Sequence, residues 1–417
     1  MFQKLQSILV KDSFRTVGAY TITGALTKAI SFAALPFFIN TLSEGDIGIL
    51  TIFSNCIVFL TPIISMGVLY TISIDYFKLP KERYAVVFSS GMIIPAVLSL
   101  VMIPFLYVFK APLEKSFNFH YNFFWLVPIS LFLNFCFEAF IILLRNENRV
   151  RLFTVVSLLK VLVEIGLSVF FVLFIYQNWY GRALAFALSG GAVGALFFYV
   201  VIKDRFLVKG IDLNVLKKEI YFGLSGMVLQ SAIFFINSSD KFFVMSFFGK
   251  EQAGFYSVAA TFATIQYIIC ISLLQYLQPL LFQKFAAAER WDKVKSLYAK
   301  YSLGMLVTLV AVLIFTWLVY HYLLKETYRD YLHYFYLLSL SSFVWTISNI
   351  FLQFVVFNKN KKFILQLSVC AISIALVINY MASTFGGIVS LAWGQIITQL
   401  LVLSIIIYFN KKLNYFA

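Results

Sequence analysis

The chain of 417 residues consists largely of apolar runs about 20 residues long or longer, and these runs limit what it can fold into. A helix rises about 1.5 Å per residue, so such a run crosses the roughly 30 Å hydrocarbon core of a bilayer. The runs lack the alternation, in segments of about ten residues, that an outer-membrane barrel requires. Only 12% of residues are charged, against about 25% in a typical soluble chain. We therefore predict an all-α polytopic membrane protein.

Twelve spans are expected from these runs, which makes an even number of crossings. They cover residues 14–39, 47–74, 84–109, 121–144, 152–176, 181–202, 220–247, 254–281, 301–324, 332–356, 363–381 and 386–409. The chain starts with the polar, basic stretch MFQKLQSILVKDSFR, which leads directly into the first span. No cleavable signal peptide is therefore expected.

The inner loop after the sixth predicted span divides the spans six and six. The predicted organisation is an N-terminal six-helix bundle over residues 1–202, a cytoplasmic inter-bundle loop over 203–219 and a C-terminal six-helix bundle over 220–417. The outer loops are short, and the longest covers only residues 110–120. The outer loops therefore leave no room for an extracytoplasmic catalytic domain.

The two halves of the chain also resemble each other where the second span of each half begins. Residues 41–50 read TLSEGDIGIL after the first span, and residues 247–256 read FFGKEQAGFY after the seventh. Aligning Gly48 with Gly254 places both glycines after a short acidic turn. Paired repeats that move around a site at mid-membrane are a common plan among transporters.

The net charge of +15 is distributed unevenly between the two sides of the membrane. With the N-terminus in the cytoplasm, the inner segments hold 24 of the 33 Lys and Arg residues, the outer loops six and the spans three. Arg182, near the start of the sixth span, is counted with the outer loops. Basic residues concentrate on the cytoplasmic side of membrane proteins. The charge therefore predicts two cytoplasmic termini and requires no nucleic-acid partner.

One stretch resembles a known family. Residues 238–260, SSDKFFVMSFFGKEQAGFYSVAA, place an acidic-basic pair before a hydrophobic step, a short turn and a Gly-aromatic-Tyr-Ser-x-Ala start of the eighth span. LPFFINTLSEGDIGIL (35–50), followed by IISMGV (63–68), is the counterpart in the first half. This pattern resembles the O-antigen flippase group (Wzx type), in the polysaccharide transport family of the multidrug/oligosaccharidyl-lipid/polysaccharide (MOP) exporter superfamily.

The resemblance implies a MATE-like fold, with two six-helix bundles around a central cavity. It also implies translocation of an undecaprenyl-diphosphate-linked oligosaccharide, an O-antigen or other surface polysaccharide repeat unit, to the outer leaflet of the bacterial cytoplasmic (inner) membrane by alternating access. A polysaccharide polymerase and a chain-length regulator are candidate partners, and a coupling ion, H⁺ or Na⁺, is left open. No cofactor, metal or enzymatic activity is expected. Where the family usually has Arg, this chain has Lys241, a point charge that cannot clamp a diphosphate with two parallel bonds.

Ionisable residues inside spans are costly and mark candidate functional positions. There are six: Lys28, Glu138, Lys160, Glu164, Asp240 and Lys241. Lys28 lies roughly 21 Å from the inner end of its span, near mid-membrane. Two interpretations of Lys28 stand: a contact to the diphosphate, or a structural pair with an acid from another span.

Lys160 and Glu164 are four residues apart and share one helix face, where they can pair. Glu138 and Lys160 are at similar depth, so an interhelical pair is also expected. Either these residues form structural ion pairs, or Glu138 or Glu164 is a carboxylate whose protonation is coupled to transport.

Asp240 and Lys241 are adjacent, and neighbours on an ideal helix point about 100° apart, so we do not expect them to pair with each other. We expect Asn237 and Lys241 to line a hydrated cavity and Asp240 to tether neighbouring helices. The polar lining is completed by Gln230 of the same span and by Thr264, Gln275 and Gln278 of the eighth span.

Two other functions compete with the flippase. A drug or cation antiporter of the same superfamily would have carboxylates dominating its cavity, whereas acids and lysines inside the spans are balanced here. A membrane enzyme such as a polysaccharide polymerase would need a large outer loop or a polar catalytic cluster. The histidines are His120, His321 and His333, and the last two flank one outer loop. We expect them to be residues of the membrane interface. The four cysteines, all inside spans, show no metal-ligand spacing.

Overall fold

The computed structural model describes residues 2–77, 79–117, 122–208, 212, 217, 227–228, 230–287, 291–357 and 361–412. These residues are almost all helical, and no strand occurs among them. The chain divides into two compact units. The first comprises Met1–Leu42 and Phe53–Met227, and the second Ser43–Ile52 and Val228–Ala417. Parts of the predicted loop, residues 209–211, 213–216 and 218–219, lie outside the described residues.

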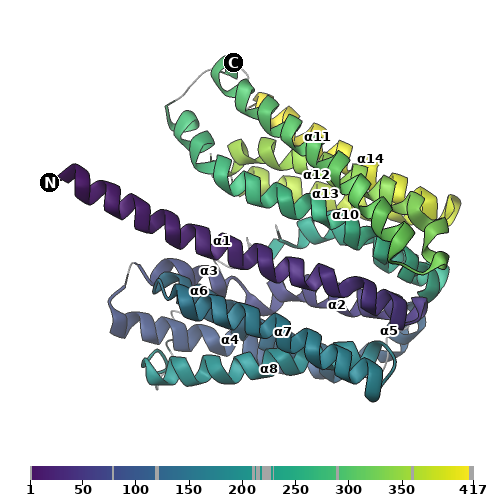
Figure 1. Cartoon of the computed structure of the whole chain (residues 1–417), viewed down its shortest axis with the longest axis horizontal. Helices are drawn as coiled ribbons and strands as arrows, with labels where there is room; N and C mark the ends of the chain where they lie inside the picture. The colour runs from purple at the N-terminus through teal and green to yellow at the C-terminus, as the bar shows by residue number, and fades with distance from the viewer. Residues whose placement is uncertain are drawn as a thin grey trace. The chain divides into compact units, whose positions relative to one another are not determined.

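The first unit contains the helices drawn from purple to teal in Figure 1. In chain order they are α1 (Phe2–Thr41), most of α2 (Glu44–Ser65), α3 (Val68–Asp75), α4 (Lys81–Val108), α5 (Lys110–Phe117), α6 (Phe123–Asn146), α7 (Val150–Phe174) and α8 (Trp179–Lys203). Helix α7 packs against α8 and α1, and α6 packs against α8 and α4. Their shared core is rich in aromatic rings, among them Phe88, Phe135, Phe140 and Phe197.

Apart from the first residues of α2, the second unit is drawn in green and yellow in Figure 1, and α12 packs against several of its helices. It contains the first residues of α2, a helical stretch over residues 230–238, α10 (Asp240–Ala286), α11 (Trp291–Tyr322), the short 3₁₀ helix η1 (Glu326–Tyr331), α12 (Leu332–Phe357), α13 (Lys361–Phe385) and α14 (Gly387–Lys412). Helix α12 packs against both α10 and α14, and α13 packs against α14. Each unit therefore buries its own apolar faces.

Within the described residues, eleven helical segments are long and apolar enough to cross a membrane. One of them, Gln230–Ile271, has 42 residues, which as a straight helix would extend about 63 Å, twice the thickness of the hydrocarbon core. The segment is broken at Gly249, whose φ of 83° and ψ of 178° are not helical. It therefore provides two spans. The predicted all-α membrane architecture with about twelve spans is confirmed.

The second predicted span, 47–74, is interrupted. Helix α2 ends at Ser65, and α3 begins at Val68 after two residues with positive φ, Met66 and Gly67. Pro62 lies in the last turn of α2, and a proline removes one backbone hydrogen bond of its helix. Hydropathy alone does not reveal this break because the residues on both sides are equally apolar.

An ion-pair bridge joins two segments outside the spans of the first unit. The Arg149 guanidinium lies 3.0 Å from a Glu147 carboxylate oxygen and 2.8 Å from an Asp204 oxygen. This links the turn between α6 and α7 to the residue that follows α8. Burial raises the pKa of Glu147, while the positive charge of Arg149 opposes that rise.

Candidate functional site

The first unit places a lysine ammonium among aromatic rings. Lys160, on α7, is half-buried, and its Nζ lies 4.3 Å from the ring centre of Phe137 on α6. The ring of Phe186 on α8 lies 5.3 Å from the same nitrogen. Such contacts attract a cation through the negative face of the ring, more strongly where water is excluded. Three neighbouring helices therefore hold one charge inside this unit.

Two half-buried carboxylates lie within the electrostatic field of this lysine. Glu138 on α6 and Glu164 on α7 both interact with the positive charge of Lys160. Among the described residues, however, no ion pair joins Lys160 to either carboxylate. The direct pairs expected from spacing and depth are therefore not formed here, because the ammonium lies over the two rings.

Arg182 belongs to the same cluster, although its position near the start of the sixth predicted span suggested an outer loop. It lies in the first turn of α8, which is capped by the Asn178 side chain accepting a bond from the Tyr180 backbone N–H at 3.0 Å. The Arg182 guanidinium lies 4.2 Å from the ring centre of Phe38 on α1, and its charge acts on Glu164. Its position inside the predicted span 181–202 already indicated that Arg182 could belong to the charges within the membrane.

Lys28 stands apart from these contacts. Its side chain is exposed on α1, and among the described residues it has no hydrogen bond, ion pair or ring contact. The helix itself is held against α7 nearby, where the hydroxyls of Thr23 and Thr154 lie 3.0 Å apart. The structure therefore presents a free ammonium on a helix that is fixed between one and two turns away.

The second unit contains a buried polar network around Asp240. This residue is 1% exposed, and one carboxylate oxygen accepts a hydrogen bond from the Tyr256 hydroxyl at 2.7 Å. Its other oxygen lies 3.4 Å from Nζ of Lys241, which also donates to the Asn237 carbonyl at 3.2 Å. Asp240 therefore ties the seventh span to the eighth.

The pairing of Asp240 with Lys241 corrects the sequence interpretation, which excluded it. Ser239 is a turn between two helical stretches, so the ideal 100° rotation does not apply at this point. The long lysine side chain can then fold back along the helix onto its neighbour. Sequence spacing gives directions only where the backbone is a regular helix.

Two amides extend the network to α13 and α14. Gln399 donates to the Asn237 side-chain oxygen at 3.1 Å, and Asn379 donates to the Ser239 hydroxyl at 2.9 Å. Asn237 also donates to the Ile233 carbonyl at 2.8 Å. The structure therefore gives Asn237, expected to line a cavity, contacts that tether helices.

The remaining predicted polar residues are dispersed. Gln230 is half-buried, and Thr264 is exposed and donates to the Thr261 carbonyl. Gln278 donates to the Gln353 side-chain oxygen at 2.9 Å, linking α10 to α12. The side chain of Gln275 lies outside the described residues.

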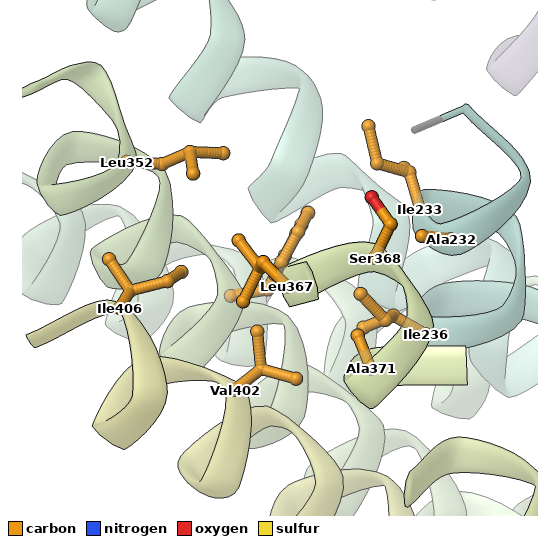
Figure 2. A pocket seen from close by; sticks show the side chains of 10 residues that line it. Ala232, Ile233, Ile236, Leu352, Leu367, Ser368, Ala371, Val402 and Ile406 are labelled. Carbon is orange, nitrogen blue, oxygen red and sulfur yellow. The ribbon is translucent and has the colours of Figure 1, made fainter. Parts of the chain in front are cut away.

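The second unit also contains a small apolar cavity of about 20 Å³. Figure 2 shows the lining side chains gathered around it from residues 232–236 and from α12, α13 and α14. Its one labelled hydroxyl, that of Ser368, donates to the Ile364 carbonyl. The cavity can hold neither a sugar nor a phosphate. Among the described residues, no group of three His, Cys, Asp or Glu side chains could hold a metal ion.

Replacing Lys160 by Met should destabilise the first unit, because Glu138 and Glu164 would lose the positive charge they share. Methionine keeps the apolar contact with Phe137 and Phe186, so the change removes mainly charge. We expect a loss of about 1–3 kcal/mol, limited by protonation of the carboxylates, measured by thermal unfolding in detergent. Lys160→Arg keeps the cation and should unfold near the wild-type temperature. Equal unfolding temperatures for wild type and Lys160→Met would contradict the assigned role.

Comparison with solved structures defines the fold. The chain matches an inward-facing multidrug resistance MATE family transporter of the MOP superfamily at 14% identity and a TM-score of 0.71, covering 92% of this chain and 95% of that one. A MOP superfamily transporter from Pyrococcus furiosus matches at 14% identity and 0.59, covering 93% of each chain. The MATE transporter ClbM in complex with Rb⁺ matches at 17% and 0.57, covering 94% and 92%. The fold is therefore MATE-like, of the MOP type.

A family model described as polysaccharide biosynthesis protein matches residues 13–285. The chain belongs to this family, and the family and the fold together indicate a membrane transporter. None of the curated proteins matches the sequence.

Proposed function

We propose that this protein is a flippase that moves an undecaprenyl-diphosphate-linked oligosaccharide from the inner to the outer leaflet by alternating access. One combination of observations supports the proposal above others: a transporter fold occurs in a family that serves polysaccharide biosynthesis. A transporter contributes to that biosynthesis by moving an intermediate across the bilayer. In this proposal the substrate is an O-antigen or other surface polysaccharide repeat unit, and the protein acts as a Wzx-type flippase.

The balance of charges inside the spans favours Lys28 as a substrate contact. Lys160 and Arg182 share the first-unit cluster with two carboxylates, and Lys241 lies beside Asp240. Lys28 has no such partner among the described residues. A diphosphate entering a low-dielectric cavity needs cations to offset its desolvation, and charge-assisted hydrogen bonds to phosphate are strong. Lys28 is the span cation that could provide them without breaking a contact.

The other predicted residues receive separate roles. Glu138 and Glu164 are the candidate coupling carboxylates, because both share the field of Lys160 and either could be released from it by protonation. Lys160, Lys241, Asn237, Gln230 and Gln275 remain candidates for the polar lining, and Asp240 remains a structural tether. We infer that the protein lies in the inner membrane with both termini on the cytoplasmic side, because Lys and Arg are concentrated in the inner loops.

An ion-coupled drug or cation antiporter is the second candidate. The structural matches to multidrug transporters favour it, although their low identity supports the fold alone. The two functions differ in what accumulates when the protein is absent.

Deleting the gene in its host tests the proposal. We expect loss of surface polysaccharide together with complete single repeat units on the lipid carrier, trapped on the cytoplasmic side. Restoring the wild-type gene should reverse both effects. Normal surface polysaccharide with raised sensitivity to cationic drugs would reject the flippase and favour the antiporter.

A further inference from the structure

The start of α2 crosses the start of the eighth span, the part of α10 that follows Gly249, at two glycines. A Cβ atom on Gly48 would overlap the carbonyl oxygen of Lys250, and one on Gly254 would overlap the carbonyl oxygen of Glu44. Both glycines are buried, and no side chain could be added to either without moving the other backbone. Only glycine permits so close an approach.

This contact is reciprocal between the two repeats. The alignment that pairs Gly48 with Gly254 also pairs Glu44 with Lys250, because both pairs have the same offset in the chain. Gly48 lies against Lys250, and Gly254 lies against Glu44. Lys250 and Glu44 are equivalent positions of the two repeats, so the two contacts are equivalent as well. A surface that meets its own equivalent in this way forms the same type of contact as the interface of a two-fold dimer.

Helix α2 belongs to both compact units. Its first residues, through Ile52, pack with the second unit, and from Phe53 onward it packs with the first. The Phe53 ring lies 5.4 Å from the ring of Phe123, within the first unit. The helix runs from Glu44 to Ser65 with its one proline, Pro62, in the last turn. A movement between the units therefore cannot preserve the contacts at both ends of this continuous rod.

We expect the glycine crossing to separate more easily than the attachment at Phe53. Backbone approaches of this kind rely on Cα–H···O contacts, each weaker than a normal hydrogen bond. Beside them, the exposed Thr327 hydroxyl donates to a Glu44 carboxylate oxygen at 3.3 Å. The attachment at Phe53, by contrast, consists of packed and buried aromatic rings, which are costly to separate.

We propose that the reciprocal Gly48–Gly254 crossing is a conformational latch, which is closed in this structure and must separate once in each transport cycle. The inference rests on the proposed alternating-access function. In each cycle the Gly48 end of α2 separates from the start of the eighth span, while the Phe53 end stays packed against Phe123.

A reversible cross-link tests the latch. In a variant whose four native cysteines (Cys56, Cys136, Cys270 and Cys370) are replaced, we would introduce Gly45→Cys with Lys250→Cys. A Cβ on Gly45 would lie 3.3 Å from Cγ of Lys250, close enough for a disulfide after small adjustment. The control pair, Leu133→Cys with Gly190→Cys, lies within the first unit, where a Cβ on Gly190 would be 3.1 Å from that of Leu133.

Oxidation of the first pair should lower surface polysaccharide by at least about tenfold, and reductant should restore it, because a locked latch traps one state of the cycle. Oxidation of the control pair should leave polysaccharide unchanged, with disulfide formation followed by thiol labelling. Undiminished polysaccharide with a complete Gly45–Lys250 cross-link would overturn the latch, as would failure of that cross-link to form. If the flippase proposal itself fails, gene deletion has no effect on the polysaccharide, which distinguishes the two failures.

Alanine substitutions provide a second test. In the cross-linking variant, Gly48→Ala or Gly254→Ala should slow disulfide formation at least about fivefold by forcing the crossing apart. Gly24→Ala and Gly166→Ala are matched controls, because nothing lies within 4 Å of a Cβ at either glycine. An unchanged cross-linking rate in both test variants would also overturn the latch.

Discussion

Replacement of Asp240 by Ala is expected to destabilise the protein by about 3–5 kcal/mol, the largest loss we expect from any single substitution. The carboxylate is buried and holds both the Tyr256 hydroxyl and the Lys241 ammonium. The Lys241 side chain is only 12% exposed, so removal of Asp240 leaves a buried charge without its counterion. The measurement is the thermal unfolding temperature of the purified protein in detergent, together with the amount of folded protein in the membrane.

Two further variants separate charge from hydrogen bonding. Tyr256→Phe removes only the hydroxyl and should cost about 1–2 kcal/mol. Asp240→Asn combined with Lys241→Met removes both charges and should recover most of the stability lost in Asp240→Ala. If the double variant is as unstable as Asp240→Ala, the dominant loss is not the unpaired Lys241 charge and our account of the network is incorrect.

The number and type of spans could be predicted from the sequence because hydropathy and helix length depend on composition alone. The break at Gly249 could be predicted as well, because the polar residues 250–252 separate the predicted spans 220–247 and 254–281. The interruption at Met66 and Gly67, which separates α2 from α3, could not be predicted. It lies among apolar residues, where the hydropathy of the sequence does not change.

The charged residues were easy to find, but their partners were not. Spacing on an ideal helix suggested that Lys160 would pair with a carboxylate, whereas two rings on neighbouring helices receive its ammonium. The same reasoning excluded the Asp240–Lys241 contact, which the structure contains. The exclusion was wrong because it assumed a regular helix, whereas the backbone turns at Ser239. Contacts between helices depend on tertiary packing, which the order of residues along one span does not specify.

The Gly48–Gly254 alignment shows the opposite case. The sequence contained the equivalence of the two glycines, but it gave no reason to place them in contact. The structure brings the equivalent positions together, with each glycine against the backbone of the other segment. The internal repeat therefore identified two equivalent positions, but only the three-dimensional structure shows that the two segments are in contact.

Lys28→Met should lower surface polysaccharide by at least about tenfold, the size expected when a charge-assisted contact to a phosphate is lost. Lys28 is exposed on α1 and has no hydrogen bond, ion pair or ring contact among the described residues, so its charge can be removed without opening a hole in the core. Protein level and unfolding temperature should therefore stay at wild-type values. This combination of lost transport and retained stability is opposite to the result expected for Asp240→Ala.

Two matched variants decide whether the charge of Lys28 is the cause. Lys28→Arg keeps a cation that can bond phosphate and should retain most of the polysaccharide. Leu26→Ala alters a neighbouring exposed position on the same helix and should have no effect. Wild-type polysaccharide in Lys28→Met would remove Lys28 from the substrate path. A fall in protein level equal to the fall in polysaccharide would instead favour a structural partner for Lys28, the alternative that the sequence left open.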